Sequence, residues 1–434
     1  MTSTDLAGRR DRVFADNAEL TWLAGLLIVA AITFNALLCF VNTHVAPINN
    51  SYVVGAEALI LTITILACYR IIDQKYALII TAIVVYTTVL ALLRAAISPE
   101  EGMNLKIVRD FLIPVTFLLL GKGSNIRVAD TIVYVATVII LFFALFEYFY
   151  LDAYLKVFSI TEYYVARGTL DAADPSLQWA HGLMLSGMRP PEQGRELLSF
   201  LGGHRVSSLF LEPISLGNFG CLIAFWAIAR SRMEQKLRFW SIAAGIVLII
   251  LSDTRFNAAF LGVGVLILLL SPRLTTPAVL AMPFVVIFGL ILAASGAEPH
   301  GLPYLEGYSF KDRLLYSGRV LLDFDLYNWL GIEASRAPTA DAGFAYVISN
   351  IGLLGFAAFW IWFMSLGGRS RYFYAFRNTS AAYFAAISCV STSQFTIKTA
   401  ALLWFLMGAL SVVQNREVLV RAPARQGSCE AVKT

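Results

Sequence analysis

Charged side chains are scarce in this sequence. Of its 434 residues only 14% are Asp, Glu, Lys or Arg, whereas 58% are apolar, and the mean hydropathy is +0.70. A soluble domain has about a quarter of its residues charged and about half of them apolar. The composition therefore excludes a soluble enzyme, a disordered scaffold and a nucleic-acid-binding protein, and it favours a protein embedded in a membrane.

Cysteine and histidine are also few, and neither follows a pairing or metal-binding motif. The cysteines are Cys39, Cys68, Cys221, Cys389 and Cys429, and the histidines are His44, His181, His204 and His300. Their scatter predicts no disulfide framework and no zinc site. Asp323 and Asp325 have the spacing of a metal-binding DxD motif, but we interpret this pair as a solvated turn. We expect neither a metal ion nor another cofactor.

Long apolar runs are what the sequence does contain. A membrane-spanning helix needs about 20 residues, and unbroken runs of this kind indicate helices rather than the alternating strands of a membrane barrel. The predicted spans lie near 20–41, 51–69, 76–97, 105–120, 128–151, 208–229, 239–252, 256–271, 277–296, 340–365, 380–396 and 400–414. The predicted fold class is an all-α polytopic membrane protein with about twelve transmembrane helices in one domain, 1–434.

The distribution of Lys and Arg orients these spans. With both termini in the cytoplasm, more than half of the 33 basic residues fall on the cytoplasmic side, whereas the short outer connections 42–50 and 98–104 have none. This is the bias that the positive-inside rule describes. Two long connections, 152–207 and 297–339, then face outward, and 415–434 forms a cytoplasmic tail. Because long ordered connections often carry function, we expect the site on the outer side.

Ionisable residues inside the spans point to the same side. Each costs about 2.5–3.5 kcal/mol to insert, and on this topology all lie in the outer half of a span or at its outer border, and none in the inner half. They are Glu57, Arg94, Lys106, Arg109, Asp110, Glu147, Glu212, Asp253, Arg255 and Lys398. One interpretation is that snorkelling or paired charges only hold helices together. The other is an outer cavity rich in arginine, whose planar fork suits the phosphate of a lipid-linked head group.

Three stretches of the second half carry a family resemblance. They are GGHRVSSLFLEPISLGNFG (202–220), LLYSGRVLLDFDLYNWLGI (314–332) and DAGFAYVISNIGLLG (341–355). Together with the expected spans and long outer loops, they resemble the superfamily of bacterial O-antigen polymerases and ligases. Within it the chain looks most like a Wzy-type exopolysaccharide polymerase, and the resemblance covers residues 200–365.

This resemblance implies a GT-C-like fold in the bacterial inner membrane. It also implies a glycosyltransferase that joins undecaprenyl-diphosphate-linked oligosaccharides at the periplasmic face, beside a chain-length regulator and export machinery. Loop arginines of this superfamily engage the diphosphate, and Arg205 and Arg319 stand at the matching positions. The ligases begin the third motif with His and a polar residue, where this chain has Asp341 and Ala342. That departure favours a polymerase over a ligase.

The chemistry of such a transfer requires no metal ion. Arginine donors can stabilise the charge that develops on a departing diphosphate, and a carboxylate can take the proton of the attacking sugar hydroxyl. The candidate bases are Glu212 and Asp341. The candidate diphosphate ligands are Arg205, Arg319 and Arg255, with support expected from Arg109, Asp110 and Arg313.

Other interpretations stay open. Glu212 precedes Pro213 and could instead cap or kink a helix, and Asp341 could instead be a helix N-cap. An O-antigen ligase shares all of this chemistry and differs in its acceptor. A lipid or sugar transporter is less favoured, because transporters place polar groups near the midplane and usually contain inverted repeats, and the sequence has neither.

Overall fold

The computed structural model describes residues 18–97, 106–174, 177–188, 195, 197–230, 234–270, 276–297, 310–368 and 370–413. The expected cytoplasmic tail, 415–434, lies outside these residues. Throughout the described part the regular structure is helical, and the only pairing of extended backbone is an isolated bridge between Met188 and His204. The prediction of an all-α protein is confirmed.

Long helices occupy the predicted apolar runs. They are α2 (Ala18–His44), α3 (Asn50–Cys68), α4 (Gln74–Ile97), α5 (Lys106–Lys122), α6 (Ile126–Phe149), α10 (Pro213–Ala229), α11 (Gln235–Ser252), α12 (Arg255–Leu270), α13 (Thr276–Ser295), α16 (Gly343–Ser365), α17 (Arg371–Ile387) and α18 (Ile397–Ser411). Seven described helices, α2, α3, α4, α6, α11, α13 and α16, are long and apolar enough to cross a membrane. The protein is therefore a polytopic α-helical membrane protein.

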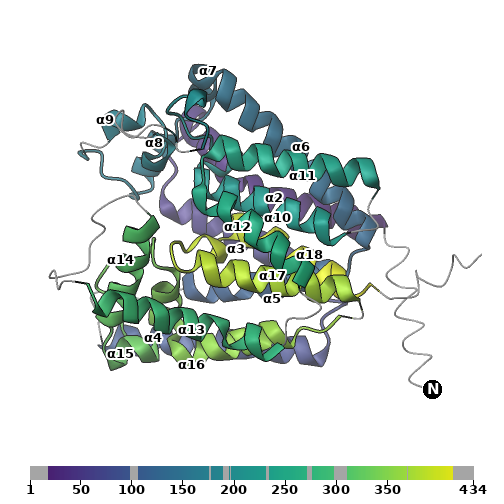
Figure 1. Ribbon diagram of the computed structural model, residues 1–434, viewed down its shortest axis with the longest axis vertical. Coiled ribbons are helices and arrows are strands. Elements are labelled where there is room, and N and C mark those ends of the chain that lie inside the picture. Colours follow the sequence, from purple (N-terminus) through teal and green to yellow (C-terminus); the bar gives the residue numbers. More distant parts are fainter. Residues whose placement is uncertain are drawn as a thin grey trace, which may run out of the picture.

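Short helices collect at one end of the helix bundle, at the left of Figure 1. From the first long connection come α7 (Leu151–Val157), α8 (Ile160–Ala166) and α9 (Leu177–Ala180), and from the second come α14 (Phe310–Leu322) and α15 (Leu326–Leu330). We call this the loop end. Helices α10 and α18 begin there and finish at the opposite end. Both long connections thus lie on the same side of the bundle, as the parity of the predicted spans requires.

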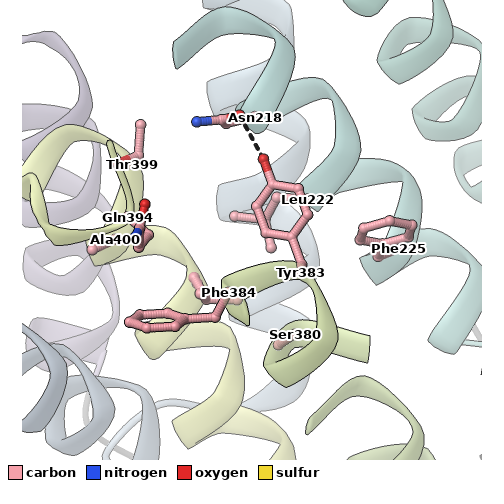
Figure 2. Close-up of a pocket in the computed structure, with 10 residues that line it drawn as sticks. Asn218, Leu222, Phe225, Ser380, Tyr383, Phe384, Gln394, Thr399 and Ala400 are labelled. Atoms are coloured by element: carbon pink, nitrogen blue, oxygen red, sulfur yellow. Dashed lines mark hydrogen bonds between the residues drawn. The ribbon is translucent and has the colours of Figure 1, made fainter. Parts of the chain in front are cut away.

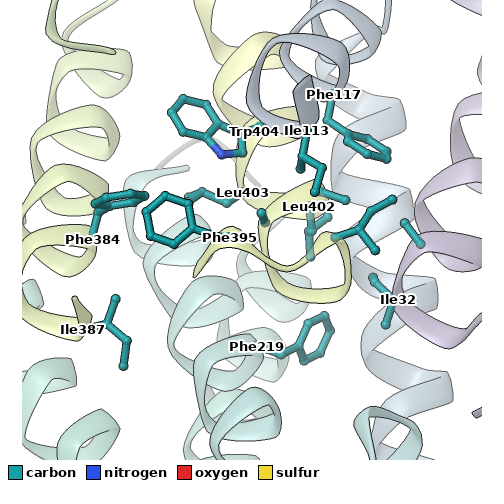
Figure 3. Packing of buried hydrophobic residues seen from close by; sticks show 14 of the residues in the cluster. Ile32, Ile113, Phe117, Phe219, Phe384, Ile387, Phe395, Leu402, Leu403 and Trp404 are labelled. Carbon is teal, nitrogen blue, oxygen red and sulfur yellow. The ribbon is translucent and has the colours of Figure 1, made fainter. Parts of the chain in front are cut away.

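The central helix of the bundle is α18. Trp404 in its middle is 1% exposed, and the residues on either side of it are buried as well. Figure 3 shows aromatic rings gathered around this helix, among them Phe219 of α10, Phe384 of α17 and Phe395. Because lipid tails are as apolar as these side chains, close packing rather than exclusion of water holds membrane helices together. The bundle therefore depends on how well α18 fits its neighbours.

Glycines set the closest contact of α18, which is with α5. A Cβ added at Gly121 would overlap the carbonyl oxygen of Phe405, and one added at Gly408 would overlap the carbonyl oxygen of Leu118. Small residues at such positions let two helix backbones approach each other in a membrane. The pair of glycines therefore fixes the depth at which α18 sits against α5.

A kink interrupts α16 at Gly352, the first glycine at the end of the third motif. Its φ of 68° lies in the left-handed region, which glycine adopts without strain. Side chains of α4 bind the carbonyl groups that the kink frees. Arg94 donates to Ser349 O at 2.5 Å, and the Tyr86 hydroxyl donates to Ile351 O at 2.7 Å. Arg94 and Gly352 thus have a structural role, in which a neighbouring helix satisfies a broken one.

One predicted span has the wrong bounds. The apolar run predicts a span over 380–396, but α17 begins at Arg371 and ends at Ile387. The guanidinium of Arg377 is buried in this helix, where it donates to the carbonyl oxygen of Met364 at 2.8 Å. A charge satisfied in this way extends the helix beyond the apolar run. The polar residues after Ile387 form a 3₁₀ turn, η5 (Ser393–Phe395), before α18 begins.

Candidate functional site

Glu212 lies at the start of α10 at the loop end, where its carboxylate accepts hydrogen bonds from three side chains. The donors are Lys398 Nζ at 2.7 Å, Ser215 Oγ at 3.0 Å and the Tyr164 hydroxyl at 3.1 Å. The residue occupies the N-cap position, but its side chain makes no capping bond to a backbone N–H group. The Glu212 carboxylate is therefore directed into this cluster, and its side chain is 29% exposed.

Lys398 is the buried partner of this carboxylate. Its side chain is only 7% exposed, and its second bond is to the carbonyl oxygen of Phe210 at 3.2 Å. The sequence marked Lys398 as an ionisable residue at the outer border of a span but gave it no role. Because α18 carries Lys398 and α10 carries Glu212, the pair joins two neighbouring helices of the core at the loop end.

A tight turn before α10 sets the position of Glu212. Ser208 and Leu211 both have positive φ, at 49° and 60°, which is unusual for residues other than glycine. The turn is held from α6, where the buried carboxylate of Glu147 accepts the backbone N–H groups of Ser207 at 3.0 Å and Ser208 at 2.5 Å. Glu147 thus orders the turn that precedes the candidate base.

Arg167 brings a further positive charge to this region. Its guanidinium lies 5.2 Å from the ring centroid of Tyr163 and 5.4 Å from that of Tyr164. Burial and the nearby Glu212 carboxylate raise the pKa of Tyr164 well above its ordinary value, so this hydroxyl stays a hydrogen-bond donor. Sequence analysis missed Arg167. Its spacing of three and four residues from two tyrosines on one helical segment was the available signal.

Asp341 forms an ion pair with Arg313, which joins the second motif region to the third. Arg313 Nη1 lies 2.5 Å from Asp341 Oδ1, and the two side chains are 23% and 34% exposed. The N-cap of α16 is Ala342, so the alternative reading of Asp341 as the N-cap is wrong. Ser317 of the second motif donates to the backbone oxygen of Asp341 at 3.0 Å. The structure thus brings these two motifs into contact.

Arg109 and Asp110 belong to a separate ionic cluster at the start of α5. Arg109 binds Glu57 of α3 and donates from Nε to Asp110 at 2.7 Å. The Tyr346 hydroxyl of α16 donates to the same Asp110 carboxylate, and Lys106 lies 5.2 Å from the ring centroid of Tyr346. These contacts join α3, α5 and α16 at the loop end. The two predicted support residues therefore bind each other and their neighbours.

The structure gives the three predicted diphosphate ligands different surroundings. Arg205 is 9% exposed, and its guanidinium donates to the carbonyl oxygens of Ser186 at 2.8 Å, Ser252 at 3.2 Å and Asp253 at 3.4 Å. Arg255, at the start of α12, is exposed, and Arg319 on α14 is partly exposed. Arg205 therefore ties the first long connection to the turn between α11 and α12, while the other two arginines have more accessible side chains.

Asp325 of the acidic pair has a structural role, whereas Asp323 is an exposed turn residue. Asp325 is the N-cap of α15, where its carboxylate accepts the backbone N–H of Asn328 at 2.9 Å. In return, the backbone N–H of Asp325 donates to Asn328 Oδ1. Among the residues that the structure describes, no group of three or more His, Cys, Asp or Glu side chains is arranged to hold a metal ion. The DxD spacing therefore reflects a helix start.

A small cavity lies between α10, α17 and α18 (Figure 2). Its volume is about 30 Å³, which accommodates one or two water molecules. Polar groups line part of it: the Tyr383 hydroxyl donates to Asn218 Oδ1 at 2.5 Å, and Gln394 Oε1 has no protein partner. Asn218 lies fewer than two helical turns after Glu212 on α10. The cavity therefore extends the polar character of the loop end a short way into the bundle.

The opposite end of the bundle also carries an ion pair. Asp130 near the start of α6 accepts from Arg230 at 2.7 Å and from the Trp226 indole N–H at 3.0 Å. The expectation that no ionisable residue lies in the inner half of a span is therefore wrong for Asp130. Its surroundings explain it as a structural pair, because one arginine and one indole satisfy the carboxylate.

Comparison with known proteins does not assign the chain to a family. No protein-family model matches the chain, no curated protein matches it, and no solved structure matches it. The functional argument therefore depends on the sequence motifs and on the side chains gathered at the loop end.

Proposed function

We propose that the protein is a membrane glycosyltransferase that joins oligosaccharide repeat units carried on undecaprenyl diphosphate, as a polymerase of bacterial exopolysaccharide or O-antigen. The observation that carries the proposal is the Glu212 carboxylate. Tyr164 of α8, Ser215 of α10 and Lys398 of α18 hold it in place, yet its side chain remains 29% exposed at the loop end. A catalytic base needs both this fixed geometry and access to the substrate.

In this proposal the loop end faces the periplasm and the protein lies in the inner membrane. The shorter helices α5, α10, α12, α17 and α18 complete twelve spans of a GT-C-like fold, with both termini in the cytoplasm. Two observations support this orientation: the excess of Lys and Arg in the short connections on the opposite side, and the presence of both long connections at the loop end.

The reaction requires a base and a site for the leaving group. A sugar hydroxyl of one repeat unit attacks the anomeric carbon of the other, and Glu212 takes the hydroxyl proton. The new glycosidic bond forms as the bond from carbon to the diphosphate oxygen breaks, so the diphosphate leaves with its electron pair. The side chains of Arg319 and Arg255 are accessible enough to stabilise that charge. No metal ion enters this scheme.

The environments of the other candidates refine their roles. Asp341 is paired with Arg313, so we assign this pair to positioning beside the diphosphate, and we add Arg167 as a cation close to Glu212. We assign Arg205 to the structure of the loop end, because a diphosphate would have to replace three carbonyl contacts of its guanidinium. The proposed diphosphate ligands are therefore Arg319 and Arg255.

The test uses a strain that lacks this protein and expresses single variants of it. The length of the glycan carried on the lipid is measured in each variant. Per folded protein, Glu212→Gln should lower polymer formation by at least a hundredfold, as loss of a general base does, and single repeat units should accumulate on the lipid. Glu162→Gln is the matched control, because this exposed carboxylate lies on α8 close in sequence to Tyr164. Accumulated long chains would identify a ligase instead. Normal polymer from Glu212→Gln at normal protein level would contradict the proposal.

A further inference from the structure

A polar pocket lies at the end of the bundle opposite to Glu212. Its volume is about 180 Å³, enough for several water molecules or one small head group. Helix α4 begins beside it, and α5, α16 and α18 all end there. The polar side chains of its lining are Lys75, Tyr76, Lys122, Ser365 and Ser411.

Positive charge dominates this pocket. Among the residues that the structure describes, its lining contains two lysines and no Asp or Glu. Lys122 donates to the Tyr76 hydroxyl and lies 4.7 Å from the centroid of that ring, while the Lys75 side chain is exposed at the rim. The nearby Asp73 carboxylate accepts the backbone N–H of Tyr76 at 3.1 Å, so it serves as a helix cap. The described lining offers no carboxylate to bind a cation, whereas Lys75 and Lys122 can both bind an anion.

The remaining groups favour an anion with several oxygen atoms. The hydroxyls of Ser365 and Ser411 donate to carbonyl oxygens of their own helices, at 2.8 Å and 2.7 Å. A hydroxyl bonded in this way can rotate toward a stronger acceptor. The ends of three helices add partial negative charge, which Lys122, Lys75 and the positive start of α4 together outweigh. Arg377 strengthens the wall by donating to Leu366 O at 3.2 Å.

We propose that this pocket binds the phosphate group of an anionic head group, between Lys75 and Lys122. Basic pockets between membrane helices on the cytoplasmic side bind the head groups of anionic lipids. Leu118 and Trp362 line the pocket beside the polar groups and provide an apolar surface for the lipid to which the phosphate is attached. On the proposed topology, this lipid belongs to the cytoplasmic leaflet. The site is separate from the transfer chemistry and does not depend on it.

Native mass spectrometry of the purified full-length protein tests the site. Phosphatidylglycerol should remain bound at least tenfold more than phosphatidylcholine. Lys75→Gln should weaken phosphatidylglycerol binding about fivefold, corresponding to about 1 kcal/mol for one lysine near an anionic lipid. The control is Lys236→Gln, an exposed lysine in the first turn of α11 at the same end, which should change binding less than twofold.

A second arm identifies the source of the phosphate. Glycerol 3-phosphate is added in excess to the complex with phosphatidylglycerol. Displacement of the lipid would show that the phosphate alone is recognised, and retention would show that the attached lipid contributes; both results agree with the proposal. Equal retention of the two lipids by the wild-type protein would overturn it. So would equal losses in Lys75→Gln and Lys236→Gln, because Lys75 is exposed and its substitution leaves the fold intact.

Discussion

Substitution of Glu212 should destabilise the protein more than substitution of Lys398, although either change breaks the same ion pair. Glu212→Gln leaves a lysine whose side chain is only 7% exposed, with only uncharged oxygens, such as that of Phe210, to accept its hydrogen bonds. Lys398→Met leaves a carboxylate that is 29% exposed and still bound to Ser215 and Tyr164. The cost of the lost partner therefore falls on the more deeply buried charge.

The magnitudes follow from this difference in burial. Removal of one partner from a buried ion pair costs about 3–5 kcal/mol, because the other charge stays buried and unpaired. We expect Glu212→Gln to fall in that range. Lys398→Met should cost about 1.5–3 kcal/mol, the value of a hydrogen bond to a charged group. The double variant should cost less than the sum of the two, by at least about 1 kcal/mol, because the residues are in direct contact.

Buried cysteines provide the assay. Cys39, Cys68, Cys221 and Cys389 are all buried, so a thiol-reactive dye reports unfolding as detergent denaturant is added. The background is Cys429→Ser, so that only the four buried cysteines can react with the dye. Glu162→Gln serves as the control and should change the free energy of unfolding by less than about 0.5 kcal/mol. A larger loss for Lys398→Met than for Glu212→Gln, or strict additivity in the double variant, would refute the reasoning.

Four further substitutions examine the packing and the arginine assignments. Gly408→Val should strongly reduce the folded yield, since a side chain there overlaps the carbonyl oxygen of Leu118 on α5, and size-exclusion chromatography in detergent should show the loss. Gly262→Val, on a glycine with nothing close to an added Cβ, should leave the yield unchanged. Arg205→Lys should lower the folded yield, because lysine cannot reach three carbonyl oxygens at once, whereas Arg319→Lys should keep the yield and lose polymer by roughly a hundred- to thousand-fold. Equal yields for the two lysine variants, measured by fluorescence of a fused reporter, would contradict the division of roles.

The helices were largely predictable because their signal is local. An apolar run long enough to span a membrane can be recognised from its own residues, without information from the rest of the chain. The start of α17 was not, because Arg377 delays the start of the apolar run, while the carbonyl groups of Met364 and Leu366 at the end of α16 satisfy its charge. A partner that comes from another helix cannot be read from composition within one run.

The candidate site was predictable as a set of residues but not as contacts. Sequence placed Glu212 and Lys398 on the same side of the membrane, yet their pairing depends on how α18 enters the bundle. Arg205 matched a motif, and only the structure shows that backbone carbonyls surround its guanidinium. Asp341 had the residue type of an N-cap, but its side chain reaches Arg313 instead. Long-range packing decides which of two local possibilities a polar side chain adopts.

The position of α18 also bears on how the protein is made. It is the last of the described helices in the chain, yet it occupies the middle of the bundle. Synthesis runs from the N-terminus, so the earlier helices enter the membrane before the helix that fills their shared groove exists. Until Ile397–Ser411 arrives, Glu212 lacks Lys398, and Gly121 faces no partner helix. A nascent chain that stops short of this segment therefore exposes an unpaired carboxylate and an unfilled groove, which are features by which membrane quality control can distinguish an unfinished copy from a complete one.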